Sequence, residues 1–292
     1  MQRDIYILGS INTDLVINTP YMPNKGETLM GKDFFTAHGG KGANQSVSAA
    51  RSGGTIHFCG CVGDDIFGKS ALESLEKEGI NCDYVEVVKG VSTGTAVIIV
   101  SGGDNRIILD SGANAKVTKE QVDDFLSLAK KDDIFLTQLE NPIDIVGYGL
   151  KKAKEKEMLV VLNPAPANKN IVPYLKYVDI LTPNEGECKL LGGKDYLKEI
   201  VHTLIITLGD KGFTIVKGND ESVFPCIKIK PVDTTAAGDT FCGAMLAEFA
   251  SGCDLIQSAQ YGSLAASIAC LSKGAQPSIP TKKEVESFNL CK

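Results

Sequence analysis

Short apolar segments recur along this chain and alternate with segments of helical periodicity. The apolar segments predict strands at residues 5–8, 56–62, 134–139, 159–162, 180–182 and 204–208. Helical patterns lie between them at residues 42–51, 67–78, 118–130 and 142–157. Strands that are apolar throughout are typical of a parallel sheet buried on both faces. The alternation therefore predicts an α/β fold, with a doubly wound, mostly parallel sheet flanked by helices.

Two segments break this alternation. Residues 15–38 carry turn-forming residues, Pro20, Pro23 and Gly26, but show no helical period. Residues 93–110 hold two β-like runs around the sequence Ser-Gly-Gly-Asp-Asn, which favours a hairpin. We interpret both segments as a small β-sheet lid, inserted into a single catalytic domain that spans residues 1–292. The alternative is that they form ordinary edge strands.

Composition and charge narrow the classes of function. The chain has 292 residues, of which 43% are hydrophobic, so it can bury a sizeable core. The net charge of −6 and the lack of a dense basic run argue against nucleic-acid binding. We expect no membrane span, since the sequence has no long apolar run. Nine cysteines behind an N-terminus unlike a signal peptide predict reduced thiols in the cytoplasm.

Residues 63–70 match the phosphate-binding P-loop pattern GxxxxGKS. Such a loop binds phosphate through backbone N–H groups and positive charge, whereas Asp64 and Asp65 would add two carboxylates to that pocket. We therefore interpret the segment as a loop with an acidic N-terminal cap on the following helix. A P-loop ATPase or GTPase is the alternative, which substitution of Lys69 would test.

The segment 232–244, VDTTAAGDTFCGA, combines small residues with a helix start. The helical pattern at 240–250 begins after Asp239, so the N–H groups of residues 236–239 would point out of a helix N-terminus. Such an end binds phosphate and stabilises developing negative charge. Asp239 could accept a proton from a substrate hydroxyl. The alternative is that Asp239 only caps the helix.

A second glycine-rich helix start, GGKGAN at residues 39–44, offers a polar surface that a ligand can approach closely. Together with it, further motifs follow in a set order: GSINTD (9–14), QLE (138–140), NPAPA (163–167), TPNE (182–185), ITLGDKG (206–212), DTTAAGDTF (233–241) and KGAQPS (273–278). This series resembles the ribokinase-like carbohydrate kinases, a family that includes fructokinases and adenosine kinases. The resemblance covers nearly the whole chain, and GSINTD, NPAPA and KGAQPS narrow it towards the kinases of ribose.

The resemblance implies ATP-dependent phosphorylation of D-ribose at the 5-hydroxyl, giving ribose 5-phosphate. Asp239 would be the catalytic base, and the backbone of Ala236, Ala237 and Gly238 would form the anion hole. The implied sugar-binding residues are Asn12, Asp14, Gly40, Lys41, Asn44, Glu140 and Asp239. Without the resemblance, the alternative interpretation is that Glu140 is a carboxylate at the start of the helix that follows Pro142.

The resemblance also implies an ATP site and two metal ions. The ATP-binding positions are Asn184, Thr207, Gly209, Asp210, Gly212, Gly238 and Ser263. Asn184 and Glu187 would hold Mg²⁺ through water. K⁺ would be bound by Asp233, Thr235, Ala269, Ser272, Gly274 and Ser278, mostly through backbone carbonyls. For Asp233 the alternative is a side chain that only caps a turn.

Relatives of this kind pair their lids, so a homodimer through the lid is expected. The segment 192–203 is shorter than in many relatives, which implies that an outer helix is trimmed. Within the family, a kinase of deoxyribose or of a nucleoside is the alternative. Outside it, a sugar-binding regulator without activity could share the fold, but Asp239 and Gly238 are both present and favour an enzyme.

Overall fold

The computed structural model describes residues 2–102 and 104–290. Its body is built on a nine-stranded sheet of order β13-β12-β11-β10-β9-β8-β1-β4-β5. The strands are β1 (Asp4–Leu8), β4 (Thr55–Gly63), β5 (Asn81–Val88), β8 (Ile134–Thr137), β9 (Leu159–Leu162), β10 (Ile180–Leu181), β11 (Thr203–Thr207), β12 (Phe213–Lys217) and β13 (Asp220–Phe224). Along this order, each pair of neighbouring strands from β11 through to β5 is parallel. The strands β12 and β13 add an antiparallel edge beside β11. The predicted mostly parallel sheet is confirmed.

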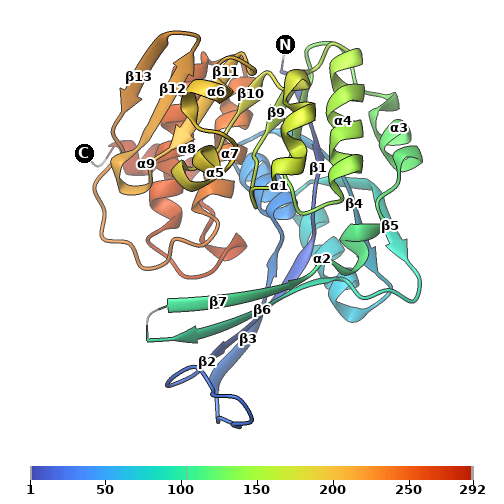
Figure 1. Ribbon diagram of the computed structural model, residues 1–292, viewed down its shortest axis with the longest axis vertical. Coiled ribbons are helices and arrows are strands. Elements are labelled where there is room, and N and C mark those ends of the chain that lie inside the picture. Colours follow the sequence, from blue (N-terminus) through green and yellow to red (C-terminus); the bar gives the residue numbers. More distant parts are fainter. Residues whose placement is uncertain (1, 103, 291–292) are drawn as a thin grey trace.

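Helices cover both faces of this sheet (Figure 1). One face carries α1 (Lys41–Arg51), α2 (Ile66–Lys77), α7 (Ala237–Ala250) and α8 (Leu255–Ala269), with α9 (Lys282–Leu290) packed on α8. The other carries α3 (Lys119–Ser127), α4 (Ile143–Glu155), α5 (Glu185–Leu190) and α6 (Lys194–Leu197). Within the described residues, the body also contains four short 3-10 helices: η1 (Gly112–Lys116), η2 (Lys169–Tyr177), η3 (Gly209–Lys211) and η4 (Gln276–Ser278).

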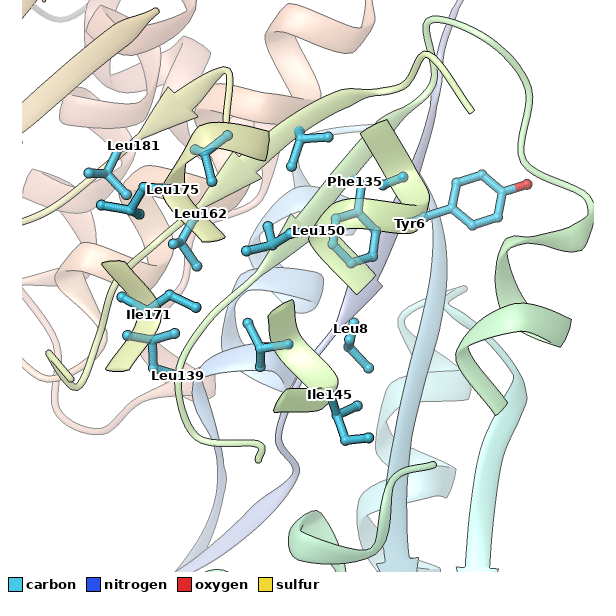
Figure 2. Packing of buried hydrophobic residues seen from close by; sticks show 14 of the residues in the cluster. Tyr6, Leu8, Phe135, Leu139, Ile145, Leu150, Leu162, Ile171, Leu175 and Leu181 are labelled. Atoms are coloured by element: carbon cyan, nitrogen blue, oxygen red, sulfur yellow. The ribbon is translucent and has the colours of Figure 1, made fainter. Parts of the chain in front are cut away.

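The packing of strand β1 explains the hydrophobic run at residues 5–8. Tyr6 and Leu8 belong to the hydrophobic cluster under α3 and α4, whereas Ile5 and Ile7 belong to the cluster under α1 and α7. Figure 2 shows side chains of β1, β8, α4 and η2 meeting in the first of these clusters. Because successive side chains of a strand point to opposite faces, a strand covered on both faces needs hydrophobic residues at consecutive positions.

A second sheet of order β3-β2-β6-β7 projects from the body (Figure 1), and we call it the lid sheet. Its strands are β2 (Asn12–Asn18), β3 (Lys32–Gly39), β6 (Gly94–Ser101) and β7 (Asp104–Asp110). β2 and β6 are parallel, and the outer pairs are antiparallel. The predicted small sheet is thus separate from the main sheet and is not one of its edges. Gly103, in the turn of the predicted hairpin, lies outside the described residues.

The loop after β1 and the start of α1 meet through two glycines. A Cβ atom on Gly42 would lie 2.5 Å from the Cα of Gly9 and 2.6 Å from the backbone nitrogen of Ser10. Backbone atoms cannot give way as a flexible side chain can, so neither position accepts a larger residue without a shift. This contact holds the N-terminus of α1 against the loop that leads into Asn12.

The apparent P-loop is filled by its own carboxylates. Asp65 caps α2 by accepting a hydrogen bond from the Gly68 N–H at 2.8 Å, and it also accepts from the Thr93 N–H at 2.8 Å. Asp64 accepts from the Gly90 N–H at 3.0 Å. The interpretation of this segment as an acidic cap is confirmed, because Asp65 occupies the helix N-terminus that a P-loop presents to phosphate. Among the helices of residues 2–102 and 104–290, none is long and apolar enough to span a membrane.

Candidate active site

Polar side chains converge at the carboxyl ends of the central parallel strands. Asn12 is the first residue of β2, directly after the loop that follows β1, while the loop after β8 carries Glu140 and the loop after β9 carries Asn163. The N-termini of α1 and α7 approach the same edge, because α1 packs on α7 and both contact β1. In open α/β sheets, ligands bind at this edge.

Asp239 lies inside the first turn of α7. The helix begins at Ala237, three residues earlier than the predicted start at residue 240, so the alternative in which Asp239 only caps the helix is wrong. Its carboxylate is buried and bound by α1: Oδ1 accepts from Gln45 Nε2 at 2.9 Å and Oδ2 accepts from Asn44 Nδ2 at 3.0 Å. Two neutral amides therefore orient both oxygens of the predicted base.

The contact with Asp239 also sets the orientation of the Asn44 amide. Because its Nδ2 donates to Asp239, its Oδ1 is left as an acceptor, and that buried oxygen has no hydrogen-bond partner among the described residues. Buried polar atoms normally have partners. A hydroxyl donor on a bound sugar would supply one here.

A lysine and several carboxylates surround the predicted base. Asp239 raises the pKa of Lys41, and Glu140 and Glu187 act in the same direction against the effect of burial. Burial raises the pKa of Asp14 to about 6, with repulsion from Glu140 and Asp239 adding to the shift. Sequence motifs that lie far apart in the chain thus share one electrostatic environment.

Glu140 binds the start of α1. Its Oε2 accepts from the backbone N–H of Lys41 at 3.0 Å and from the Ser10 hydroxyl at 2.5 Å. The N-cap of α4 is Pro142, so the alternative role of Glu140 at the start of that helix is wrong. A carboxylate at the N-terminus of α1 is favoured by the helix dipole.

Asn12 is held in place by a residue that the sequence analysis did not identify. Asn114, in η1, donates from Nδ2 to Asn12 Oδ1 at 2.7 Å and to the Ile11 carbonyl at 3.0 Å, and it accepts from the Ile11 N–H at 2.9 Å. A cavity of about 370 Å³ adjoins these residues, lined by Asn12, Glu140 and, from the lid sheet, Leu109. The body and the lid sheet together form this cavity. No motif pointed to Asn114, because its contacts depend on chain folding.

The predicted anion hole lies at the start of α7. Ala236 has left-handed backbone geometry with φ 58°, and the Ala237 N–H donates to the Thr234 carbonyl at 3.2 Å. Of the three predicted residues, Ala237 thus has its N–H engaged. A Cβ atom added to Gly238 would meet no atom within 4 Å, so the space above this residue is open. The first N–H groups of a helix have no acceptor inside it.

The predicted nucleotide residues divide between a strand pair and a turn. Asn184 and Thr207 form a parallel bridge beside β10 and β11, so the structure brings these two together. Gly209, Asp210 and Gly212 follow in the turn before β12, where both glycines have positive φ, 59° and 101°. Ser263 lies on α8, where its carbonyl accepts from Ser267.

Asn184 and Glu187 form a capping box on α5. Asn184 Oδ1 accepts from the Glu187 N–H, and Glu187 Oε2 accepts from the Asn184 N–H, both at 2.8 Å. Each side chain therefore has one oxygen engaged, and Glu187 retains a second carboxylate oxygen. The described residues contain no group of three or more His, Cys, Asp or Glu that could hold a metal. These oxygens fit Mg²⁺ that keeps most of its waters.

Asp233 joins the two loops of the predicted K⁺ site. Its Oδ1 accepts from the Thr235 N–H at 2.9 Å, which is the turn cap considered as the alternative. Its Oδ2 accepts from the Gly274 N–H at 2.9 Å, forty-one residues away. The other predicted ligands lie near these loops: Ala269 at the end of α8, Ser272 after it and Ser278 in η4. Asp233 thus does more than cap its own turn.

Comparison with known proteins agrees with this geometry. Residues 2–282 match the pfkB family carbohydrate kinase profile. The chain is 36% identical to a ribokinase of Haemophilus influenzae over 302 residues, covering 99% of both chains. It resembles the crystal structure of ribokinase from Thermotoga maritima with a TM-score of 0.88 at 36% identity, covering 99% of both chains. It also resembles the structure of Arabidopsis thaliana ribokinase complexed with ribose and ATP, with a TM-score of 0.87, 30% identity and 99% coverage of both chains. The chain belongs to the pfkB family of carbohydrate kinases.

Proposed function

We propose that this protein phosphorylates D-ribose at the 5-hydroxyl with ATP and releases ribose 5-phosphate and ADP. The observation that supports this most strongly is Asp239, a buried carboxylate one residue after Gly238 and the open space above it. A base beside a helix N-terminus is what transfer of a phosphoryl group to a hydroxyl requires.

Asp239 accepts the proton of the sugar hydroxyl in this proposal. The hydroxyl oxygen forms a bond to the γ-phosphorus of ATP as the bond from that phosphorus to the leaving ADP oxygen breaks. The backbone of residues 236–238, at the start of α7, stabilises the negative charge on the transferred group. Positioning and electrostatic stabilisation supply most of the rate enhancement in such reactions.

In this proposal, the residues around the cavity beside Asn12 and Glu140 bind the sugar. Asn44 offers its unpartnered Oδ1, and Asp14 and Lys41 lie in the same charged environment. Gly40, with φ 90°, leads into α1, and a Cβ there would lie 2.7 Å from the Asn12 nitrogen. A sugar with several hydroxyls would satisfy this set of donors and acceptors.

ATP would contact the strand pair and turn formed by Asn184, Thr207, Gly209, Asp210 and Gly212, with Gly238 under the phosphates and Ser263 beside the base. When bound, Mg²⁺ screens phosphate charge, and Asn184 and Glu187 would hold it through water. K⁺ would lie between the loops that Asp233 joins and would fix the position of residues 236–238. The two-loop contact of Asp233 supports this role.

Activity with a panel of sugars tests the substrate. Purified protein is assayed for ADP release with ATP and pentoses, hexoses or nucleosides, and we expect ribose to be preferred over 2-deoxyribose. A site built to bind a hydroxyl leaves its buried groups unpaired when that hydroxyl is missing, which can cost roughly 10⁴-fold. Equal catalytic efficiency with both sugars would contradict the proposed pocket and favour a deoxyribose kinase.

Replacement of the base tests the mechanism. We expect Asp239→Asn to lower turnover by at least roughly 10²-fold, because general base catalysis contributes about that much. Far-UV circular dichroism checks that the variant is folded. A folded variant with wild-type turnover would exclude Asp239 as the base.

Dependence on K⁺ is a separate test. Turnover is followed in buffer free of alkali cations while K⁺ or Na⁺ is added at constant ionic strength. We expect activation by K⁺ and much less by Na⁺, and we expect Asp233→Ala to abolish it. A flat response to both ions would exclude the cation site.

The lid sheet supports two further parts of the proposal: a single catalytic domain in which the lid sheet closes over the sugar, and a homodimer that pairs two lid sheets. Phe34 and Ile108 are 62% and 67% exposed on this sheet. Large hydrophobic side chains that are exposed on a projecting sheet favour burial against another protein surface. Sedimentation of the wild-type chain and of Ile108→Asp tests the dimer, since the charged variant should sediment as a monomer.

We also propose a cytoplasmic location. The eight cysteines of the described residues are free thiols, and reduced thiols are typical of the cytosol.

A further inference from the structure

A chain of buried side-chain amides ends on the proposed base. Gln45, fully buried in α1, donates from Nε2 to Asp239 Oδ1 at 2.9 Å and to Asn163 Oδ1 at 3.1 Å. Its Oε1 accepts from Gln138 Nε2 at 2.6 Å. Gln138 and Asn163 follow β8 and β9, so the chain connects the main sheet to α7 across α1.

A backbone carbonyl sets the direction of every hydrogen bond in this series of amides. Asn163 Nδ2 donates to the carbonyl of Thr182 at 2.8 Å, so Asn163 must present its oxygen to Gln45. Gln45 must then present its NH₂ group to Asn163 and to Asp239, and its oxygen to Gln138. An amide turned the other way would place two oxygens together. The amide of Gln45 is thus oriented before any substrate arrives.

The close packing of α1 on α7 makes this contact possible. A Cβ atom on Gly243 would lie 2.3 Å from the backbone oxygen of Gln45, so α7 approaches α1 to a distance that only glycine allows. The charged groups that interact with Asp239 come from other elements: Lys41 from α1, Asp14 from β2 and Glu187 from α5. Glu140, in the loop after β8, interacts with Asp14 and Lys41 of the same group. None of these charges donates a hydrogen bond to Asp239 Oδ1 in the described structure, and Gln45 does.

We propose that Gln45 is a positioning residue that fixes the plane of the Asp239 carboxylate for proton transfer, and that Gln138 and Asn163 fix Gln45. The inference rests on the proposed role of Asp239 as the base. Asn44 holds the other oxygen, but its unpartnered Oδ1 is proposed to bind the sugar, whereas both polar atoms of the Gln45 amide are already engaged by protein groups. Gln45 therefore acts on the rate of the reaction without binding the substrate.

The test uses Gln45→Met, which keeps the length of the side chain and donates no hydrogen bond. We expect kcat to fall roughly 10–100-fold, as for other small displacements of reacting groups, with the KM values for sugar and ATP nearly unchanged. Ser48→Ala is the matched control. The Ser48 hydroxyl, also buried in α1, donates to the Thr240 carbonyl of α7 at 2.8 Å without touching Asp239. We expect this control to lose stability and to keep its kcat.

A double-mutant cycle separates positioning from general support of the fold. If Gln45 acts through the carboxylate, Gln45→Met should have no further effect on turnover in the Asp239→Asn background. Additive losses, or a kcat of Gln45→Met equal to that of the wild type, would overturn the inference while leaving Asp239 as the base. Wild-type turnover of Asp239→Asn alone would overturn the base and this inference together. Should Gln45→Met fail to fold, Gln138→Met replaces it, with a smaller loss of kcat expected and an unchanged kcat counting against the chain.

Discussion

Replacing Gly238 by alanine should separate the stability of this protein from its activity. Gly238 lies in the first turn of α7, its φ is not in the left-handed region, and an added Cβ would meet no atom within 4 Å. Alanine is favoured over glycine in a helix by about 1 kcal/mol, and it also restricts the unfolded chain. We therefore expect Gly238→Ala to increase the free energy of unfolding by about 0.5–1 kcal/mol.

The same methyl group should slow phosphoryl transfer. It would occupy the open space above the start of α7, where the transferred group must approach the backbone N–H groups. Loss of one such donor costs about 2.7–4 kcal/mol of transition-state stabilisation, so we expect turnover to fall by roughly 10²–10³-fold. An enzyme can thus gain stability and lose activity through a single methyl group.

Two measurements and one control check this prediction. Urea unfolding gives the stability, and steady-state assays with ribose and ATP give the turnover. Gly42→Ala is the control, because its Cβ would lie 2.5 Å from the Cα of Gly9, and overpacking of this kind costs about 1–3 kcal/mol. Wild-type turnover of Gly238→Ala would refute the argument that a phosphate approaches this residue. A destabilised Gly238→Ala would refute the argument that the space is open.

Three other substitutions test separate parts of the site. Burial raises the pKa of Asp14 from 3.8 to about 6, so its ionised form destabilises the folded state by about 3 kcal/mol at pH 8, and this effect disappears as the pH falls towards 4. Urea titrations should therefore show Asp14→Asn to be more stable than the wild type at pH 8 and equal to it near pH 4; a stability difference that does not change with pH would contradict this reasoning. Lys69→Ala should leave ATP affinity unchanged in calorimetry, because Asp65 fills the helix N-terminus beside it; a large loss would restore the P-loop interpretation. Asn114→Ala should raise the KM for ribose and leave that for ATP unchanged, since Asn114 holds Asn12; equal effects on both would contradict that role.

The sequence by itself determined the architecture, because the spacing of hydrophobic residues along the chain indicates which segments form strands and helices. Strands covered on both faces are hydrophobic at most consecutive positions, so β1, β4 and β9 could be predicted from their residues alone. The acidic cap at Asp65 was equally readable, because a helix start and a carboxylate three residues before Gly68 are neighbours in the chain. Helix α8 was not predicted because its small apolar residues do not lie on one face: Ala259 and Ala265 pack into two different clusters, so the sequence shows no clear helical period.

Only the tertiary structure decided how the site works. The sequence placed Asp239 at the edge of a helix, yet the extra turn from Ala237 moves it inside and turns its carboxylate towards α1. Gln45 lies 194 residues from Asp239 in the chain, and Asn114 lies 102 residues from Asn12. Neither pair leaves a local pattern, because their contacts depend on the order of the strands and on how closely α1 and α7 pack. The sequence determines which chemical group each position carries, whereas the tertiary structure determines which partner orients that group.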